Sequence, residues 1–348
     1  MPLQITIKPS DHSFSCPDGD TVLVAALASD LTLPYGCRNG ACGSCKGRIL
    51  AGEVDYGPHQ ASALTDDEKR EGLALFCCAR PLTNLTIEVK EVSRAGDIRI
   101  KRLPCRIESI EKPADDVAIV KLKLPANERL QYLCGQYVDF LLKDGRRRSF
   151  SLATPPHDDT LLELHIRYVA DGVFTEQLFN MFRGREILRL EGPFGGFYLR
   201  EDSDKPIIFV AGGTGFAPIK AMIEHALHFE HNRQMVLYWG ARRMVDLYLP
   251  DLPGKWQQRS RHFTFIPVLS DPAPDDDWPG RTGFVHQAVL DDFANLSGYQ
   301  VYACGGPAMV GAARSSFTAT RSLPPDEFFA DSFTYAAQSE SQQDPSQK

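Results

Sequence analysis

The sequence has no long apolar run and no excess of positive charge. Among its 348 residues, 38 lysines and arginines stand against 45 aspartates and glutamates, for a formal net charge of −7. A chain of this charge lacks the basic surface that attracts nucleic acid or an anionic membrane. No apolar segment approaches the roughly 20 residues that span a bilayer. The composition therefore argues against a nucleic-acid-binding protein and against a membrane-spanning one.

The N-terminal stretch MPLQITIKPSDHSF also lacks the apolar core and the cleavage site of an export signal, so export is not expected. The nine cysteines are few and scattered for a disulfide framework in a chain of this length. Four of them form one pattern, and the remainder fit free thiols in a reducing compartment, which predicts a cytoplasmic protein. The remaining cysteines are Cys16, Cys78, Cys105, Cys134 and Cys304.

The four patterned cysteines are the most informative feature of the chain. Cys37, Cys42 and Cys45 lie in YGCRNGACGSCKG with the spacing C-x4-C-x2-C, and Cys77 follows further along. This is the ligand spacing of a plant-type 2Fe–2S cluster. The small residues between the cysteines allow backbone N–H groups to approach the negative sulfurs. The pattern therefore predicts that these four cysteines bind an iron–sulfur cluster.

The fourth ligand is ambiguous because Cys77 and Cys78 are adjacent. Cys77 is favoured because LFCCARP then places Pro81 where it closes the turn, and Cys78 is interpreted as a packed neighbour. A zinc site would usually show two C-x2-C pairs, and only Cys42 and Cys45 have that spacing. A disulfide pair suits short secreted chains, whereas this chain has 348 residues.

The hydrophobic pattern divides the chain into segments and predicts a multidomain protein of α+β and α/β class. The pattern of residues 1–93 predicts a β-grasp ferredoxin domain, and the basic, polar composition of residues 94–101 predicts a linker. Residues 102–200 contain short strands broken by proline and glycine, which predicts an antiparallel β-barrel. Residues 203–335 alternate apolar strands with helices, which predicts a doubly wound parallel sheet. Residues 336–348 are rich in glutamine and serine and predict a disordered tail.

Local patterns in the first segment predict individual elements. LQITIKP and HSFSC indicate one hairpin, and KGRILAGEVDY indicates a second. TVLVAALASD predicts a helix capped by Asp20, because leucines recur there at four-residue spacing. LTIEVKEV predicts the closing strand.

Two motifs in the second segment suit a flavin. Arg148, Phe150 and Ser151 form the pattern R-x-F/Y-S at the end of a strand. An arginine can neutralise the flavin pyrophosphate. An aromatic ring can stack on the isoalloxazine, and a serine can hydrogen-bond near the reactive nitrogen of that ring system. Gly172 and Thr175 open a predicted helix whose N-terminus attracts phosphate. Alone, the first pattern also fits a basic surface turn, and the second fits a capped helix.

Two glycine-rich motifs follow apolar strands in the third segment. Gly213, Thr214 and Gly215 lie in GGTGFAP, where a pyrophosphate could approach both the main chain and a helix start. The motif departs from the G-x-G-x-x-G fingerprint, so a structural turn is the alternative. Cys304 begins CGGP, again between a strand and a helix. Its thiol could touch a nicotinamide ring or could be a buried small residue.

In this order the motifs resemble those of the ferredoxin–NAD(P)+ reductase superfamily, in the branch with an N-terminal plant-type ferredoxin domain. That branch includes reductase components of multicomponent oxygenases and the CDP-6-deoxy-Δ3,4-glucoseen reductases, which the sequence resembles most. The resemblance covers residues 1 to about 335 and rests on the cluster loop, RSFS, GGTGFAP and CGGP. It implies three cofactors: a 2Fe–2S cluster, FAD and NADH, with NADPH possible. It also implies an electron-accepting partner protein, either a dehydratase or an oxygenase component.

The resemblance further implies roles for single residues. Ser151 and Cys304 would lie at the reacting atoms, where they would tune geometry and no side chain need act as a general base. The family often ends with an aromatic that covers the flavin, and EFFADSF offers Phe329 and Phe333, of which Phe333 is taken as the site residue. The implied cofactor-binding residues are Arg148, Phe150, Ser151, Gly172, Thr175, Gly213, Thr214, Gly215 and Phe333.

The resulting hypothesis is a reductase in which a hydride from NADH reaches FAD and electrons leave singly through the cluster. One rival is a non-catalytic iron–sulfur carrier or redox sensor, which the intact GGTGFAP and CGGP motifs disfavour. A second rival is a free-flavin or quinone reductase with the cluster as an accessory. Arg242, Arg243 and Asp246 leave the choice of nucleotide open, although related reductases generally favour NADH.

Overall fold

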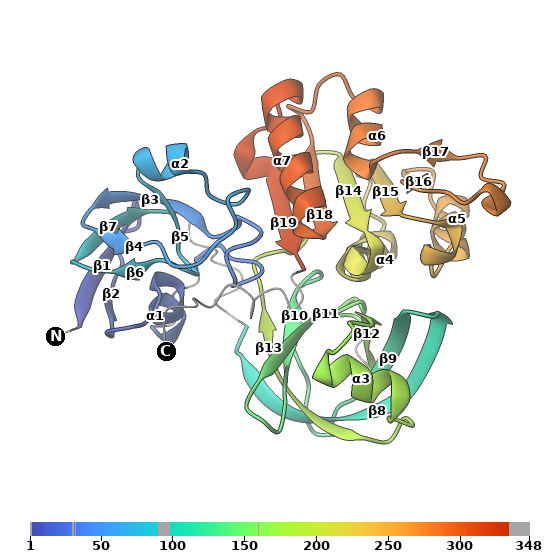
Figure 1. The fold of residues 1–348 in the computed structure, drawn as a ribbon, viewed down its shortest axis with the longest axis horizontal. Coiled ribbons are helices and arrows are strands. Elements are labelled where there is room, and N and C mark those ends of the chain that lie inside the picture. Colours follow the sequence, from blue (N-terminus) through green and yellow to red (C-terminus); the bar gives the residue numbers. More distant parts are fainter. Residues whose placement is uncertain (1, 30, 32, 90–97, 159, 334–348) are drawn as a thin grey trace. The chain divides into compact units, whose positions relative to one another are not determined.

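The computed structural model describes residues 2–29, 31, 33–89, 98–158 and 160–333 (Figure 1). The chain folds as two compact units. The first comprises Met1–Arg99 with Gly195–Phe197 and Ala330–Phe333, and the second contains Ile100–Phe194 and Tyr198–Phe329. The predicted tail and residues 94–97 of the predicted linker lie outside the described residues, and Lys101 already belongs to a strand. Within the described ranges no helix is long and apolar enough to cross a bilayer.

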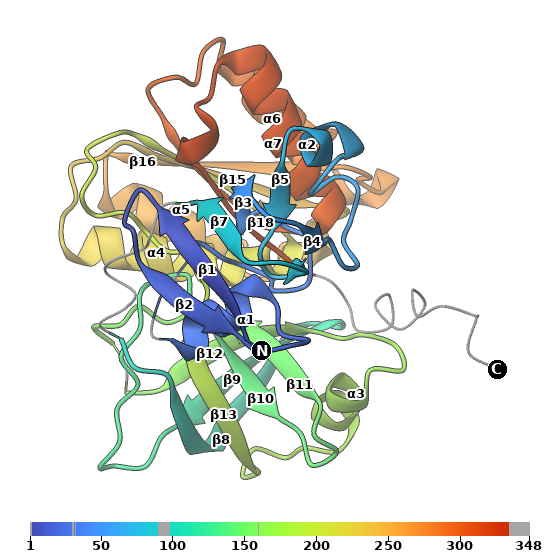
Figure 2. The same cartoon turned by 90° about the vertical axis from the view of Figure 1, so that its left-hand side faces the viewer.

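The first unit is built on a five-stranded sheet in the order β2-β1-β7-β3-β5 (Figure 2). Strand β1 pairs antiparallel with β2 and parallel with β7. Ile5 and Ile7 alternate with polar residues along β1 and are fully buried, as a strand with one face on a core requires. The elements of this sheet and its helices are β1 (Leu3–Lys8), β2 (Ser13–Cys16), α1 (Val22–Ala28), β3 (Lys46–Ala51), α2 (Asp66–Arg70), β5 (Leu73–Leu75) and β7 (Leu85–Glu88).

The predicted second hairpin is wrong. Strand β3 is flanked by β5 and β7. With both edges of β3 occupied, β4 (Val54–Asp55) pairs instead with β6 (Arg80–Pro81). The predicted helix cap is also displaced by one residue, because the side chain of Thr21, not Asp20, accepts a hydrogen bond from the Val24 N–H over 3.3 Å.

The second unit begins with a six-stranded antiparallel barrel in the order β11-β10-β13-β8-β9-β12. A single bridge between Leu152 and Leu164 joins the segment after β11 to β12 and closes the barrel. Fully buried side chains such as Val138 and Leu164 fill its interior. The elements are β8 (Lys101–Ala114), β9 (Val117–Lys123), β10 (Tyr137–Leu141), β11 (Arg147–Ser151), β12 (Leu162–Arg167), α3 (Val173–Asn180) and β13 (Ile187–Phe194).

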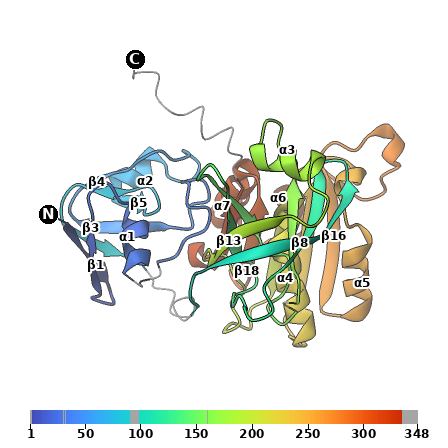
Figure 3. The same ribbon diagram turned by 90° about the horizontal axis from the view of Figure 1, so that it is seen from below.

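The strands from β14 onward form a doubly wound sheet in the order β17-β16-β15-β14-β18-β19. Strand β14 pairs in parallel with β15 on one side and with β18 on the other. Helix α5 packs beside β16 and α7 beside β18 (Figure 3). The strands are β14 (Ile207–Gly212), β15 (Met235–Ala241), β16 (Phe263–Leu269), β17 (Arg281–Thr282), β18 (Gln300–Gly305) and β19 (Phe328–Ser332). The helices are α4 (Phe216–His228), α5 (Asp251–Arg259), α6 (Val285–Asp292) and α7 (Pro307–Arg321).

The chain order of these strands creates a switch point between β14 and β18. From β14 the chain continues to β15 and β16 on one side and returns later to β18 on the other. In doubly wound sheets, ligands bind at the carboxyl ends of the strands where the order reverses in this way. The predicted fold class, with a β-grasp, an antiparallel barrel and a doubly wound sheet, is confirmed.

Candidate functional site: cysteine loop, flavin strand and glycine loop

The four predicted cluster ligands come together as two pairs of sulfurs. The Cys37 thiol is hydrogen-bonded to Cys42, and Cys45 is hydrogen-bonded to Cys77. Among the described residues, no group of three or more Cys, His, Asp or Glu side chains is arranged to hold a metal ion. Two pairs of cysteine sulfurs suit a binuclear cluster, in which each iron takes two cysteines and shares bridging sulfides. The residues present therefore fit a 2Fe–2S cluster.

Backbone N–H groups of the loop point at two of these sulfurs. The N–H groups of Ala41 and Cys42 donate to Cys37 Sγ over 3.4 and 3.3 Å. Those of Cys37 and Ser44 donate to Cys42 Sγ, each over 3.4 Å. The hydrogen bond from Cys37 is the main reason why the pKa of Cys42 falls to about 6. Donors of this kind stabilise thiolates and tune a bound cluster.

The contacts of the adjacent thiols distinguish Cys77 from Cys78. A hydrogen bond from Cys45 lowers the pKa of Cys77 to about 4. The pKa of Cys78 is raised, first by its hydrogen bond to Cys77 and then by burial. Cys78 Sγ packs against Gly40, where an added Cβ would lie only 2.8 Å away. These contacts favour Cys77 as the proposed fourth ligand and Cys78 as a packing residue.

Strand β11 carries the residues predicted to bind the flavin. Arg147 forms ion pairs with Asp139 and Glu191, and its Nη1 lies 3.5 Å from Asp139 Oδ2. Arg148 forms no ion pair with any described residue, so its charge remains available to a pyrophosphate. Phe150 is half-buried, and its ring centroid lies 5.4 Å from that of Phe174 on α3. Ser151 ends the strand and is 7% exposed.

Gly172 and Thr175 build the entry to α3. No side chain caps this helix, so no capping side chain competes with a phosphate for the N–H groups of its first turn. The Thr175 hydroxyl donates to the carbonyl of Val169 over 2.9 Å and so holds the preceding turn. A Cβ on Gly172 would lie 2.6 Å from that hydroxyl, so glycine is required for close packing. Thr175 thus shapes the proposed pyrophosphate site through its side chain.

The glycine loop GGTG forms a short 3-10 turn, η2 (Gly213–Gly215), between β14 and α4. Gly213 has φ of 54°, in the left-handed region that glycine adopts readily. The indole Nε1 of Trp239 donates to the Gly213 carbonyl over 3.0 Å and anchors the loop. A Cβ on Gly215 would lie 2.0 Å from the carbonyl oxygen of Cys304. The loop is therefore fixed against the strand that carries CGGP.

Cys304 lies at the carboxyl end of β18 and pairs in register with Ala211 of β14. The two motifs predicted to bind the nicotinamide nucleotide thus meet at the switch point of the sheet. The Cys304 side chain is completely buried, and Thr214 is 7% exposed. Contact between the Cys304 thiol and the nicotinamide remains a prediction.

Arg167, at the end of β12, is a residue that sequence reasoning missed. Its Nη1 lies 3.4 Å from Asp116 Oδ2, but Nε and Nη2 are buried without a hydrogen-bond partner in the described part of the chain. Nη2 would lie 3.2 Å from a Cβ placed on Gly213. Two unpartnered guanidinium donors beside a glycine loop are suited to a diphosphate. The only sequence signal was one arginine in HIRYV, which also fits an ordinary strand.

The loop after β15 carries the residues expected to distinguish the two nucleotides. Arg242 is 78% exposed and lies 3.5 Å from Asp271, and Arg243 lies 3.4 Å from Asp275. The Arg243 N–H donates to Asp246 Oδ2 over 3.0 Å. Both arginines therefore already have carboxylate neighbours, and the preference for NADH stays a prediction.

The two C-terminal aromatics have different surroundings. The Phe329 ring stacks on Tyr302 at 4.8 Å, with the Arg200 guanidinium 4.7 Å from its centroid. Phe333 follows the end of β19 and is half-buried. Phe329 is thus held by other side chains, and the role of Phe333 as the flavin cover stays a prediction.

Comparison with known protein families agrees with this arrangement of sites. Three family profiles match: the 2Fe-2S iron-sulfur cluster binding domain over residues 5–82, the oxidoreductase FAD-binding domain over 104–198, and the oxidoreductase NAD-binding domain over 209–315. The CDP-6-deoxy-L-threo-D-glycero-4-hexulose-3-dehydrase reductase of Yersinia pseudotuberculosis is 40% identical over 96% of this chain and 99% of its own. Reductase component 1 of terephthalate 1,2-dioxygenase from Comamonas sp. is 35% identical over 95% of this chain and 97% of its own.

Solved structures agree as well. The cytochrome P450 reductase GcoB of Amycolatopsis superposes with a TM-score of 0.75 at 32% identity, covering 96% of this chain and 99% of that one. Identity at this level along nearly the whole chain extends the likeness beyond the fold to the family. The chain belongs to the iron–sulfur flavoprotein reductases, oxidoreductases in which a ferredoxin domain, an FAD domain and an NAD domain carry electrons from NADH to a partner protein.

Proposed function

We propose that this protein is a cytoplasmic reductase that supplies single electrons to a pyridoxamine-phosphate dehydratase acting on a CDP-hexulose. The observation that supports it is the likeness to the Yersinia dehydrase reductase, which spans all three domains at 40% identity. The predicted cluster, flavin and nucleotide motifs all lie inside that match.

Each proposed residue has a task that follows from its surroundings. Arg148 and the first turn of α3 bind the FAD pyrophosphate, and Arg167 binds the nicotinamide dinucleotide at the glycine loop. Ser151 and Cys304 orient the reacting rings. The flavin, when bound, supplies the change from two-electron to one-electron transfer, so no side chain has to act as a general base.

A second candidate partner is the terminal component of an oxygenase. The terephthalate dioxygenase reductase supports it, because that relative matches nearly the same length of this chain at 35% identity. Both candidates require the same route for the electrons and differ only in the protein that docks near the cluster loop. Arg38, Asn39 and Ser44 of that loop are proposed to form the docking edge.

The first experiment is an anaerobic titration of the purified protein with NADH and then NADPH, followed by absorbance and EPR. Bleaching of the flavin together with the signal of a reduced 2Fe–2S cluster is expected with NADH. No bleaching with either nucleotide would overturn the reductase and revive a non-catalytic carrier or redox sensor. Bleached flavin without a cluster signal would contradict electron transfer through the cluster.

The acceptor is tested by reconstitution with a purified CDP-hexulose dehydratase and with a terephthalate oxygenase component. The reductase is expected to support product formation with the dehydratase and not with the oxygenase component. A Cys45→Ser variant should keep NADH-dependent reduction of ferricyanide and lose reduction of the partner. If Cys45→Ser still supports the partner, the cluster is an accessory and a free-flavin or quinone reductase becomes the better description.

A further inference from the structure

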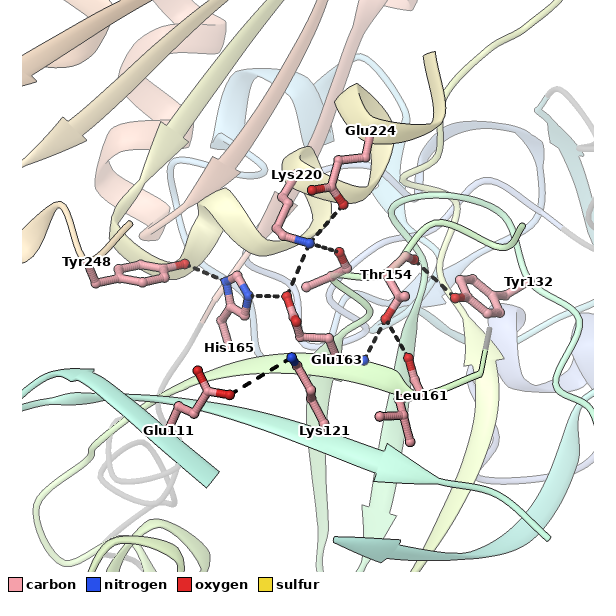
Figure 4. A network of polar contacts seen from close by, with 11 residues as sticks. Glu111, Lys121, Tyr132, Thr154, Leu161, Glu163, His165, Lys220, Glu224 and Tyr248 are labelled. Atoms are coloured by element: carbon pink, nitrogen blue, oxygen red, sulfur yellow. Dashed lines mark hydrogen bonds and ion pairs between the residues drawn. The ribbon is translucent and has the colours of Figure 1, made fainter. Parts of the chain in front are cut away.

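A buried ionic network joins the barrel to the nucleotide-binding sheet within the second unit (Figure 4). Lys220 Nζ on α4 lies 3.2 Å from Glu163 Oε1 on β12 and 2.8 Å from Glu224 Oε2 on its own helix. The exposed fractions of the Lys220 and Glu163 side chains are 11% and 16%. Charges removed from water carry a large desolvation cost unless they are paired and hydrogen-bonded, so this pair depends closely on its geometry.

All three donors of the Lys220 ammonium are used. The third donates to the main-chain oxygen of Ala153 over 3.1 Å. Ala153 lies two residues after Ser151, and its own N–H donates to the Glu163 carbonyl over 2.8 Å. An ammonium group has three donors and no acceptor, so Lys220 is satisfied only while three separate segments hold their positions. These segments are the stretch after β11, strand β12 and helix α4.

His165 extends the network toward the glycine loop. Its Nε2 lies 3.0 Å from Glu163 Oε1 and its Nδ1 lies 2.8 Å from the Tyr248 hydroxyl. Because a carboxylate only accepts, Nε2 donates to Glu163, and in the neutral ring Nδ1 then accepts from the Tyr248 hydroxyl. Tyr248 packs edge-on against Trp239 with ring centroids 5.2 Å apart. Trp239 in turn holds the Gly213 carbonyl.

The charges of the network reinforce this arrangement. Burial alone would raise the pKa of Glu163, but the hydrogen bond from His165 and the charge of Lys220 outweigh it and lower that pKa to about 2. Burial opposes the ionised form of Lys220 too, yet the charges of Glu224 and Glu163 raise its pKa. Burial lowers the pKa of His165, which favours the neutral ring. At neutral pH the network therefore contains an ion pair and a neutral histidine.

The network ends on both cofactor sites without belonging to either. One end is the main chain just after Ser151, the proposed flavin contact. The other end is the first part of α4, which begins directly after Gly215, together with Trp239 behind the glycine loop. A shift of Lys220 would therefore move the two sites relative to each other.

We propose that Lys220 is a positioning residue for hydride transfer, which with Glu163, His165 and Tyr248 fixes the nicotinamide loop against the flavin strand. This proposal rests on the function proposed above and extends that function to residues outside every cofactor motif. Lys220 is not among the residues proposed to bind a cofactor, and it acts through the main chain on both sides. A displacement of about 1 Å between reacting groups can lower a rate on the order of 100-fold, so a small loosening suffices.

Lys220→Met tests the proposal, because methionine nearly keeps the length of the side chain and removes all three donors. Stopped-flow reduction by NADH, measured anaerobically per bound FAD, should show a limiting rate on the order of 10- to 100-fold lower. The Kd for NADH should change less than about threefold, because no nucleotide contact is removed. Hydrogen–deuterium exchange without NADH should rise together in residues 152–154 and 213–219.

Tyr238→Phe is the matched control. Tyr238 is also a buried tyrosine of this sheet, and its hydroxyl donates to Asp292 Oδ2 of α6 over 2.6 Å, away from the barrel. The Tyr238→Phe variant should keep the wild-type limiting rate and the wild-type hydrogen–deuterium exchange in residues 152–154 and 213–219. Tyr248→Phe removes one hydroxyl of the network and keeps the ring, so it should lower the rate by a smaller factor than Lys220→Met.

A wild-type limiting rate and wild-type exchange in FAD-loaded Lys220→Met would overturn the proposal, even with a lower melting temperature. If that variant does not fold, Tyr248→Phe decides the question in the same two assays. If neither nucleotide reduces the flavin of the wild-type protein, the proposed function fails instead. The two failures are therefore distinguishable.

Discussion

The Arg167 guanidinium presents two buried donors without partners beside the glycine loop. Hydrogen bonds to charged groups contribute about 1.5–3 kcal/mol, which corresponds to a change in affinity on the order of 10- to 100-fold. We expect Arg167→Ala to raise the KM for NADH by that factor and to leave the FAD content unchanged. Steady-state kinetics with ferricyanide and the flavin absorbance of the purified variant measure the two quantities.

Asp116→Asn serves as the control for Arg167→Ala. Asp116 is the exposed partner of the same guanidinium, so its loss should leave the KM within about twofold, as for most exposed ion pairs. Loss of FAD from Arg167→Ala with an unchanged KM would show that the arginine serves the flavin pyrophosphate and not the nicotinamide dinucleotide.

The adjacent thiols Cys77 and Cys78 provide a second test on single residues. Cys77→Ser should abolish or strongly distort the cluster, because a thiolate hydrogen-bonded to Cys45 is removed. Cys78→Ser should retain near-wild-type iron content and EPR signal, because that sulfur packs against Gly40. Iron and sulfide analysis with EPR compares the two variants, and a reversed pattern would transfer the ligand role to Cys78.

Spacing explains why some residues could be predicted and others could not. Cys37, Cys42 and Cys45 are close in sequence, so the loop chemistry was visible without a structure. Arg167 and Lys220 acquire their roles only from segments that are far away in the chain and near in the fold. No local pattern distinguishes such an arginine or lysine from an ordinary strand or helix residue.

Among the secondary-structure elements, β3 shows the limit of local patterns. KGRILAGEVDY has the alternation and the glycine of a hairpin, but β3 already has a neighbour on each side. Pairing in a sheet depends on which edges are free, and a local pattern cannot report this. Apolar stretches such as PIIFVAG, which becomes β14, were predictable because a buried strand is a continuous apolar run, whereas the short β17 has no such run.

The turn between β14 and α4 allows a steric prediction at this scale. Gly215→Ala would place a Cβ 2.0 Å from the Cys304 carbonyl oxygen, so either the turn that holds Gly215 or strand β18 would have to shift its main chain. We expect a loss of about 2 kcal/mol or more in the free energy of unfolding, as for other overpacked sites, and weaker NADH binding. Thermal melts and NADH titration of the FAD-loaded protein measure both effects.

Gly254→Ala is the comparison for Gly215→Ala. Gly254 lies inside α5, and a Cβ there would meet nothing within 4 Å. Alanine should therefore stabilise the protein by about 0.5–1 kcal/mol through its higher helix propensity. Equal effects of the two substitutions would show that the close approach of Gly215 to Cys304 is not rigid.

For the molecule as a whole, the division into two units means that unfolding need not be a single transition. The folded-state pKa of Glu163 is about 2, against an ordinary value of 4.5. A lowered carboxyl pKa contributes stability above the ordinary value, and that contribution is lost as the pH falls from about 4.5 toward 2. At pH 7 the contribution is on the order of 3 kcal/mol.

Glu163→Gln should therefore destabilise the second unit at pH 7 and reduce the loss of stability between about pH 4.5 and 2. Flavin fluorescence reports the unfolding of the second unit, and cluster absorbance reports the unfolding of the first unit. The unfolding transition of the first unit should not move. An equal shift of both transitions, or the same acid sensitivity in variant and wild type, would contradict the assignment.

The parallel pairing of β14 with β18 has a consequence for synthesis on the ribosome. Their neighbouring ends carry Gly212 and Cys304, so the switch point between them exists only after the chain has been translated through β18. The β-grasp strands, the barrel strands and β14 to β16 emerge earlier and can pair among themselves. During this interval β14 has one vacant edge, which a nascent chain must keep from other chains until β18 arrives. The nicotinamide site is consequently one of the last features of this enzyme to be assembled.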